Sequence, residues 1–472
     1  MSTFPSRQEQ PETQAIEVIK ELPGDQPEDV LFDTLFGVRT IELNRPKALH
    51  SLNGSMIRKI VPRLQEWAKS DMANVVVIKG SGPKAFCAGG DVKHLAEENM
   101  KGEDGQQRST DYFALEYKLD HLIATYSKPY VAFMDGITMG GGVGLSIHAP
   151  FRIATERTVF AMPETTIGFF PDVGASFFLP RMPGGVGIYL ALTSERLTGV
   201  NAFYAGIATH YIHSTSLHAL ERRLAELRFK DYDGMRERIA LIDSTIEEFC
   251  TGLPYDEPML IQGKLRDAID RVFTKTSVPD IIAALQAEQK GEMKEWAEKT
   301  LATIQQRSPT SVYVTLRQMQ LGRRWSIIET FRREHQMAGK FMRHPDFTEG
   351  VSALLIRKDN KPVWQPASLE DVKPEDNIAE PFFEVEGAEP IGLLNARDFR
   401  EYPHRELGLP QDAEVEEVVR KTLASRKAIV NQFVKARKGK QGVKEIVEEV
   451  LLRKTELDAN NKAVWLANAG EA

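Results

Sequence analysis

In the first half of the chain, continuous apolar runs alternate with longer amphipathic stretches. Residues 53–69 repeat apolar side chains every three or four positions, which predicts a helix with one buried face, and a second helix is predicted over residues 112–126. Residues 74–78 and 130–134 are continuous apolar runs, which is typical of strands covered on both sides. Strand, helix and strand with short connections predict an α/β core over residues 30–215.

From residue 216 the strand-like runs nearly vanish, and residues 216–378 predict a helical C-terminal domain. Residues 359–410 are rich in Pro, Glu and Asp and predict irregular or extended chain. Residues 379–472 form an extension that returns to a helical pattern from about residue 413. The helices predicted in the C-terminal domain cover residues 217–230, 235–249, 264–273, 278–288, 292–306 and 311–321.

Composition limits the class of protein. A chain of 472 residues exceeds one compact core, and 42% hydrophobic residues are enough to bury several. The net charge of −7 argues against nucleic acid as the main partner of the whole chain. Only two cysteines occur, without a CxxC or HExxH motif, so neither a disulfide framework nor a metal site is expected. There is no run of about 18 apolar residues, so no membrane-spanning segment is predicted.

Residues 1–29 are rich in Gln, Pro and Glu and predict a disordered leader. They lack the apolar stretch of a secretory signal and the Arg-rich, acid-poor composition of a mitochondrial presequence.

A basic stretch lies near the other end of the chain, between Arg420 and Lys444. Flanking glutamates favour a solvated helix face, while contact with RNA or another anion is the alternative. The stretch holds nine basic residues and no acid: Arg420, Lys421, Arg426, Lys427, Lys435, Arg437, Lys438, Lys440 and Lys444.

One glycine motif resembles a dinucleotide fingerprint but lies in the wrong context. Gly80, Gly82 and Ala85 match the G-x-G-x-x-A pattern after a predicted strand. The following residues, 86–90, interrupt the long helix that such a turn requires, so we expect no dinucleotide cofactor.

Two other glycine clusters suit a different chemistry. Gly89 and Gly90 follow the strand at 74–78, and Gly140–Gly144 follow the strand at 130–134. Backbone N–H groups at such turns can approach a carbonyl oxygen closely, and two that converge form an oxyanion hole. The simpler interpretation of each cluster alone is a tight turn.

Two carboxylates stand in an apolar loop downstream. Glu164 and Asp172 flank Ile167, Phe169 and Phe170, so full exposure to solvent is not expected. Apolar surroundings and a neighbour of like charge raise a carboxyl pKa, which suits a base or nucleophile beside an acid or stabiliser.

In their order and spacing, these motifs resemble the crotonase superfamily. They are Asn44-Arg-Pro-Lys-Ala-Leu49, Ala85-Phe-Cys-Ala-Gly-Gly-Asp91, the triple glycine 140–142 and Pro163-Glu164. The run from Met162 to Gly174, with Ser308–Ser311, Asp346–Gly350 and Asp359–Pro366, resembles the 3-hydroxyisobutyryl-CoA hydrolase branch.

The resemblance implies a crotonase-type core of stacked ββα units and a set of site residues. By this resemblance, the N–H groups of Gly90 and Gly141 are expected to hold the thioester oxygen, with Glu164 attacking the thioester or activating water and Asp172 as its partner. Glu116 is expected to contact the acyl group or its hydroxyl. Residues 45–49 and 91–94 border the CoA moiety, which belongs to the substrate, so no separate cofactor is implied. The resemblance also implies a mitochondrial location, whereas oligomeric state varies within the superfamily and a homo-oligomer is possible.

One position separates reactions within the superfamily. Hydratases carry an acidic residue three positions after the oxyanion glycine, where this chain has Gly144, so addition of water to a double bond is disfavoured. Isomerisation and hydrolysis of 3-hydroxypropionyl-CoA stay open. Ala175 and Ser176 replace expected glycines, which predicts a narrower pocket. Some fungal and plant members of the family are part of the small subunit of the mitochondrial ribosome, and the basic stretch keeps that alternative open.

Overall fold

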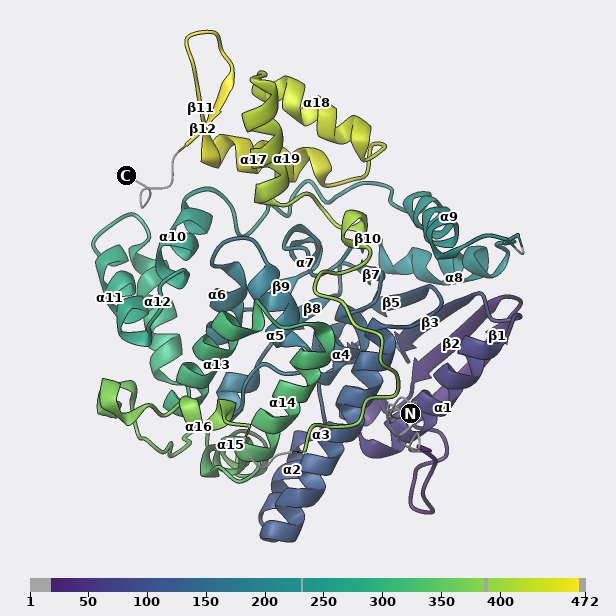
Figure 1. Cartoon of the computed structure of the whole chain (residues 1–472), viewed down its shortest axis with the longest axis vertical. Coiled ribbons are helices and arrows are strands. Elements are labelled where there is room, and N and C mark those ends of the chain that lie inside the picture. Colours follow the sequence, from purple (N-terminus) through teal and green to yellow (C-terminus); the bar gives the residue numbers. More distant parts are fainter. Residues whose placement is uncertain (1–17, 231, 386–388, 467–472) are drawn as a thin grey trace, which may run out of the picture.

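A six-stranded sheet forms the centre of the computed structural model, which describes residues 18–230, 232–385 and 389–466 (Figure 1). Its strand order is β1-β2-β3-β5-β7-β10; β1 and β2 are antiparallel, and the remaining neighbours are parallel. Four consecutive buried residues in β3 explain its uninterrupted apolar sequence. The strands are β1 Val30–Leu35, β2 Val38–Leu43, β3 Val75–Gly80, β5 Tyr130–Met134, β7 Phe151–Ala154 and β10 His210–Tyr211.

A smaller sheet of four strands, in the order β4-β6-β8-β9, forms the second layer. Strands β4 Ala85–Cys87, β6 Ile137–Met139 and β8 Val159–Ala161 run parallel, and β9 Leu197–Thr198 is antiparallel to β8. Successive segments of the chain therefore add one strand to each sheet, as the predicted stacked ββα units require.

The predicted core helices form, with one difference in length. Helix α1 (Gly54–Lys69) starts after Asn53, whose side chain accepts a hydrogen bond from Met56 N at 2.9 Å. Helix α3 (Glu103–Ala124) begins nine residues before the predicted start at 112. Its polar first half carries no apolar periodicity. The other helices of the core are α2 Val92–Asn99, α4 Gly141–Ile147, α5 Ala175–Phe178, α6 Val186–Thr193 and α7 Val200–Tyr204.

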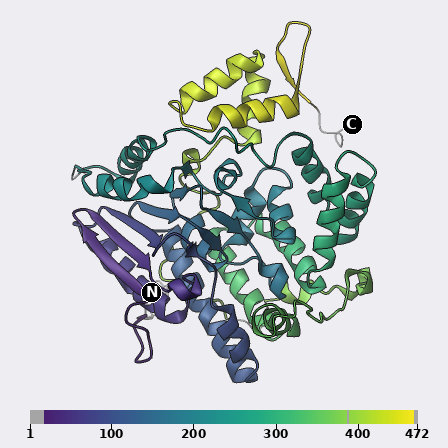
Figure 2. The same cartoon turned by 180° about the vertical axis from the view of Figure 1, so that it is seen from behind.

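Helices dominate from residue 217 onward. Helix α14 packs on α3, and its ring of Phe341 stacks on Phe170 with centroids 5.4 Å apart, so this region shares the apolar core of the carboxylate loop. Its helices are α8 Leu217–Ala225, α9 Met235–Glu247, α10 Gly263–Phe273, α11 Val278–Glu288, α12 Lys294–Gln305, α13 Pro309–Gly322, α14 Ile327–Phe341, α15 Pro345–Val351 and α16 Glu380–Phe383. Both views place α10–α12 on the side of the molecule opposite β1 and β2 (Figures 1 and 2).

The extension has two parts. Residues 389–411 cross the core as an irregular segment, here called the strap. A C-terminal subdomain follows at one end of the molecule (yellow in Figure 2). Its elements are α17 Asp412–Thr422, α18 Arg426–Ala436, α19 Val443–Lys454 and the hairpin of β11 Thr455–Leu457 and β12 Ala463–Trp465.

Residues 1–17 of the expected leader lie outside the described residues. The described residues that follow contact α1: Asp25 forms an ion pair with Arg58, and Asp29 pairs with Lys59 at 2.8 Å. Within the described chain, no helix has the length and apolar character needed to cross a bilayer.

Candidate active site

The two glycine turns meet where β4 ends and α4 begins. A Cβ atom built on Gly141 would lie 3.3 Å from the backbone N of Gly90, so the turns are in direct contact. Neither the Gly90 nor the Gly141 N–H donates to a backbone carbonyl in any turn or loop of the described chain. Both groups are therefore available to a ligand oxygen.

Carboxylates surround this junction. A Cβ on Gly141 would lie 2.5 Å from Oε1 of Glu116, on α3, and one on Gly140 would lie 3.1 Å from Oε1 of Glu164, at the start of a 3-10 turn (Glu164–Ile167). Asp172 lies on the same apolar loop, and its Oδ2 accepts a hydrogen bond from Tyr117 OH at 2.7 Å. The three acids are at most 5% exposed. The structure thus brings together the five residues predicted for the site, Gly90, Glu116, Gly141, Glu164 and Asp172.

Burial is the main electrostatic influence on these acids. It raises the pKa of Glu164 and of Glu116 well above the usual range, and the nearby charge of Asp172 raises both further. Burial also raises the pKa of Asp172 to about 7, although the hydrogen bond from Tyr117 opposes the shift. A loop of this kind holds protons near neutral pH and can exchange them with a reacting group.

Sequence reasoning missed Asp120, one helical turn after Glu116. Both carboxylate oxygens lie 2.7 Å from the Cβ that a residue at position 144 would carry, so Asp120 limits the space beside Gly144. Neither oxygen has a hydrogen-bond partner in the described chain, and burial raises the Asp120 pKa well above its usual range. The four-residue spacing from Glu116 on a predicted helix was the signal that could have revealed it.

Glu334, on α14, was also missed. Its two oxygens accept hydrogen bonds from Gly174 N at 2.7 Å and Ser176 N at 2.9 Å, so it fixes the loop that follows Asp172. Burial raises its pKa to about 8. No sequence signal links Glu334 to a loop some 160 residues earlier, because only the packing of α14 on the core brings them together.

The two segments expected to border CoA contact each other. Arg45 Nη2 lies 3.0 Å from Asp91 Oδ2, and a second guanidinium nitrogen donates to the Ser51 carbonyl at 2.5 Å. At the rejected dinucleotide motif, β4 begins at Ala85 and the next helix begins only at Val92, so the long helix of such a site is absent from this turn.

His210, Asp243 and Glu247 place ligand-type atoms close enough to hold a metal ion. The ammonium of Lys440 fills this group instead, 2.8 Å from His210 Nε2 and 2.6 Å from Glu247 Oε1. The cluster therefore joins the C-terminal subdomain to the core.

Comparison with known proteins identifies the family. A family model described as enoyl-CoA hydratase/isomerase matches residues 38–383. The chain belongs to the enoyl-CoA hydratase/isomerase family. A carnitinyl-CoA dehydratase from Mycobacterium thermoresistibile has a similar structure, with a TM-score of 0.66 and 33% identity over 77% of this chain and 98% of that one. The crotonase-type α/β fold with a helical C-terminal region is confirmed.

This chain is similar in sequence both to an enzyme and to a ribosomal protein. The mitochondrial 3-hydroxyisobutyryl-CoA hydrolase of Danio rerio is 44% identical over 344 residues, which are 73% of this chain and 87% of that protein. The small ribosomal subunit protein mS47 of Neurospora crassa is 60% identical over 446 residues, 93% of this chain and 88% of its own. The expected hydrolase-branch resemblance and mitochondrial location are confirmed.

Proposed function

We propose that the protein hydrolyses a short acyl-CoA thioester, with 3-hydroxyisobutyryl-CoA as the substrate and the free acid and CoA as products. The observation that carries this proposal is the contact between the Gly90 and Gly141 turns, with the Glu164 carboxylate beside them. Two N–H groups without a backbone partner, with a carboxylate beside the same turn, suit acyl transfer, in which negative charge develops on a carbonyl oxygen.

The thioester oxygen accepts hydrogen bonds from the Gly90 and Gly141 N–H groups. Glu164 either attacks the carbonyl carbon or takes a proton from a water that attacks it; both routes stay open. A tetrahedral intermediate forms, the C–S bond breaks, and CoA leaves as a thiolate that is protonated. On the attack route, water then hydrolyses the acyl-enzyme anhydride and restores the Glu164 carboxylate.

The other acids have supporting roles in this reaction. Glu116 contacts the acyl group or its 3-hydroxyl, because its Oε1 lies beside the Gly141 turn. Asp172, with a pKa raised to about 7 by burial, supplies the proton that the leaving thiolate takes up. CoA enters as part of the substrate, so no separate cofactor takes part.

The hydrolase relative supports this substrate class, since it is named a 3-hydroxyisobutyryl-CoA hydrolase and matches 73% of this chain. Gly144 and the Asp120 carboxylate beside it argue against hydration, because a side chain at position 144 has no room to hold a second catalytic group.

An acyl-CoA panel tests the proposal. Purified protein is incubated with 3-hydroxyisobutyryl-CoA, 3-hydroxypropionyl-CoA and crotonyl-CoA, and both free thiol and hydrated product are measured. We expect thiol release that is fastest with 3-hydroxyisobutyryl-CoA, and no hydration of crotonyl-CoA. Hydration without thiol release contradicts the assignment, and faster release from another acyl group changes the substrate but not the reaction.

We further propose, as a second function, that the protein is part of the small subunit of the mitochondrial ribosome. The mS47 relative favours this, because its match covers 93% of this chain and therefore includes much of the extension. Only part of the basic stretch 420–444 is left to bind an anionic partner. Lys440 is buried in the cluster with His210, and several of the other basic residues of the stretch pair within the subdomain: Arg420 with Glu416, Lys421 with Glu417, Arg437 with Glu414, and Arg426 with the Thr455 hydroxyl.

Lys427, Lys435, Lys438 and Lys444 form no ion pair within the described chain, which leaves them for an anionic partner. Co-sedimentation with mitochondrial ribosomes tests this function, using the full chain and a variant with these four lysines changed to Gln. We expect the full chain to sediment with the small subunit at moderate salt and the variant to sediment less. A full chain that stays in the supernatant contradicts the proposal and leaves the hydrolase reaction untouched.

A further inference from the structure

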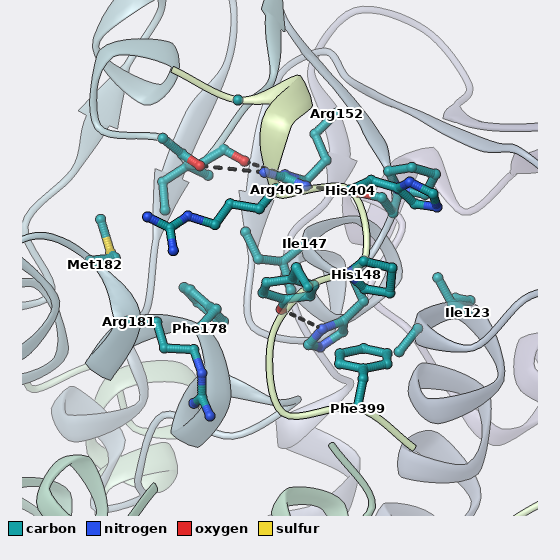
Figure 3. Close-up of a pocket in the computed structure, with 18 of the residues that line it drawn as sticks. Ile123, Ile147, His148, Arg152, Phe178, Arg181, Met182, Phe399, His404 and Arg405 are labelled. Atoms are coloured by element: carbon teal, nitrogen blue, oxygen red, sulfur yellow. Dashed lines mark hydrogen bonds between the residues drawn. The ribbon is translucent and has the colours of Figure 1, made fainter. Parts of the chain in front are cut away.

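A cavity of about 550 Å³ lies at the C-terminal end of α4, the end opposite Gly141, and Figure 3 shows side chains that line it. The core supplies one wall, including Ile147, the last residue of α4, and His148 after it. The strap closes it with residues 397–411. Those strap residues lie beyond the segment 38–383 that matches the family model, so this cavity depends on the extension.

The charges on the lining have one sign. Five cationic side chains line the cavity, and none of the described lining residues is Asp or Glu. In a chain of net charge −7, such an imbalance around an enclosed space favours an anionic occupant. The five residues are Lys128, Arg152, Arg181, Arg397 and Arg405.

Arg152 shows the imbalance most clearly. Its guanidinium donates to the carbonyls of Ile207 at 2.6 Å, Ala149 at 2.8 Å and Gly206 at 3.5 Å, and it forms no ion pair with an acid of the described chain. A guanidinium carries five N–H donors, so two are left over. Burial lowers the Arg152 pKa to about 10, but the group stays charged at neutral pH. The Arg152 side chain is partly buried and lines the cavity, so an anion bound there would supply the counter-ion that it lacks in the described chain.

Arg405 enters the cavity from the strap. Its Nη2 donates to Gln411 Oε1 at 2.7 Å and lies 3.6 Å from Glu414 Oε1, an acid that does not line the cavity. The side chain is 45% exposed, and these two contacts use one of its guanidinium nitrogens. In the view of Figure 3, Arg152 and Arg405 occupy the upper part of the cavity, and Phe178 and Phe399 the lower part. Arg181 does not add to this group, because its nitrogens bind the carbonyls of Phe177, Gly322 and Trp325.

The remainder of the lining carries no acidic side chain and includes an apolar wall. Ile123, Ile147, Phe178 and Phe399 offer carbon surface. Burial lowers the His148 pKa to about 4, so this histidine is neutral. The cavity thus combines charged donors at one part with apolar walls at another, and its volume lies within the range of about 300–1,000 Å³ that holds small organic ligands.

We propose that this cavity is a second ligand site, separate from the acyl-CoA site, and that it binds a nucleoside phosphate. The phosphate lies between Arg152 and Arg405, whose guanidinium groups keep N–H donors without a partner in the described chain. The flat base packs against Phe178 and Phe399. Arginine suits a phosphate because its planar fork donates two parallel hydrogen bonds.

Calorimetric titration of the full chain with UDP tests this site, with uridine and inorganic phosphate as separate arms. We expect one UDP to bind per chain, and uridine to bind at least about tenfold more weakly. Arg405→Gln should lower the affinity for UDP about tenfold. Arg420→Gln is the matched control, because Arg420 is an exposed arginine of α17 that pairs with Glu416 and does not line the cavity. Its UDP affinity should equal that of the unchanged chain.

Arg397→Gln is a second strap variant, included in case Arg405→Gln does not fold. It should also lower the affinity for UDP. A further titration in the presence of saturating CoA separates the two sites, since UDP should then bind with unchanged affinity. The proposal is overturned by any of three results: no heat with UDP up to about 1 mM, equal affinity in both strap variants and the control, or loss of UDP binding when CoA is present.

Discussion

Helix α4 separates two groups of ionisable side chains, one acidic and buried, the other basic and partly exposed. At its first residue, Gly141, the turn contacts Glu116, and Glu164, Asp172 and Asp120 lie around it. At its other end, Ile147 and His148 line a cavity with five cations and no described acid. Among the described residues, the four acids form no ion pair. Of the cations, Arg405 pairs with Glu414 and Arg181 with Glu401, whereas Arg152 binds only carbonyl oxygens.

The two groups differ in how their side chains respond to burial. Carboxylates respond to burial by binding protons, and the pKa of Asp172 is raised to about 7 and that of Glu334 to about 8. A guanidinium cannot release its proton at neutral pH and depends on carbonyls or on an anion from outside. The acid group is therefore suited to proton transfer, whereas the basic group is suited to binding.

A third buried group shows the case in which both signs are present. Lys440 lies against Glu247 and His210. Burial acts to raise the Glu247 pKa, but hydrogen bonds and charge from His210 and Lys440 together outweigh it and lower this pKa to about 2. This cluster joins two parts of the chain and needs neither protons nor a ligand.

Closing the space at the glycine turns should have the largest effect. Gly141→Ala places a methyl group 3.3 Å from Gly90 N, where the substrate oxygen must lie, and 2.5 Å from Glu116 Oε1. We expect kcat for thioester hydrolysis to fall about 10²- to 10³-fold, as for the loss of one oxyanion donor. Gly291→Ala is the control, since its nearest neighbour would be 3.7 Å away and it lies far from α4 in sequence. A Gly141→Ala rate within about twofold of the unchanged protein contradicts the oxyanion hole.

The second-largest effect is expected when Lys440 is removed from its cluster with His210 and Glu247. Lys440→Met leaves Glu247 and Asp243 without a positive partner, and we expect the free energy of unfolding in urea to fall by about 3 kcal/mol. Lys438→Met, at an exposed lysine two residues earlier, should change it by less than about 0.5 kcal/mol. Equal losses in the two variants count against a structural role for this cluster.

The acid group predicts a dependence of stability on pH. The Glu334 pKa is raised to about 8 in the folded state, so between its ordinary value of 4.5 and about 8 the folded chain binds protons that the unfolded chain releases. The free energy of unfolding should therefore fall as pH rises through this window. Glu334→Gln should make that fall shallower, by up to about 1.4 kcal/mol per pH unit.

Urea unfolding at several pH values between 5 and 9 measures this slope. Glu66→Gln, at an exposed glutamate on α1, should run parallel to the unchanged protein. A steeper slope in Glu334→Gln is incompatible with a raised pKa at this carboxyl.

The smallest effect concerns the contact between the cavity and the catalytic loop. Tyr402 OH donates to His148 Nδ1 at 2.8 Å, and His148 Nε2 donates to the Val173 carbonyl at 2.9 Å, next to Asp172. Tyr402→Phe removes the first bond, and we expect a loss of about 1 kcal/mol in the free energy of unfolding. Tyr255→Phe, at a side chain that is 98% exposed, should show no loss. If the two variants are equally stable, the bond between the strap and His148 does not hold the strap in place.

The sequence predicted the core strands because burial on both faces leaves an unbroken apolar run, as in β3 and β5. It also predicted the loop acids Glu164 and Asp172, because carboxylates among phenylalanines are unusual. The first half of α3 was missed, since residues 103–111 are mainly polar and give no apolar period.

Long-range packing accounts for most of what could not be predicted. Glu334 reaches the catalytic loop only through α14, and the strap forms the cavity only by crossing the core. The basic stretch shows both kinds of contact. Arg420 and Lys421 pair with the flanking glutamates Glu416 and Glu417, which the sequence shows, but only the fold brings Glu247 to Lys440.

The central claim is that the acid group at the start of α4 breaks a thioester. Steady-state hydrolysis of 3-hydroxyisobutyryl-CoA by Glu164→Gln, beside the unchanged protein and Glu66→Gln, tests it most directly. The account predicts a fall in kcat of about 10²- to 10⁴-fold for Glu164→Gln and none for Glu66→Gln. An unaltered rate in Glu164→Gln contradicts it.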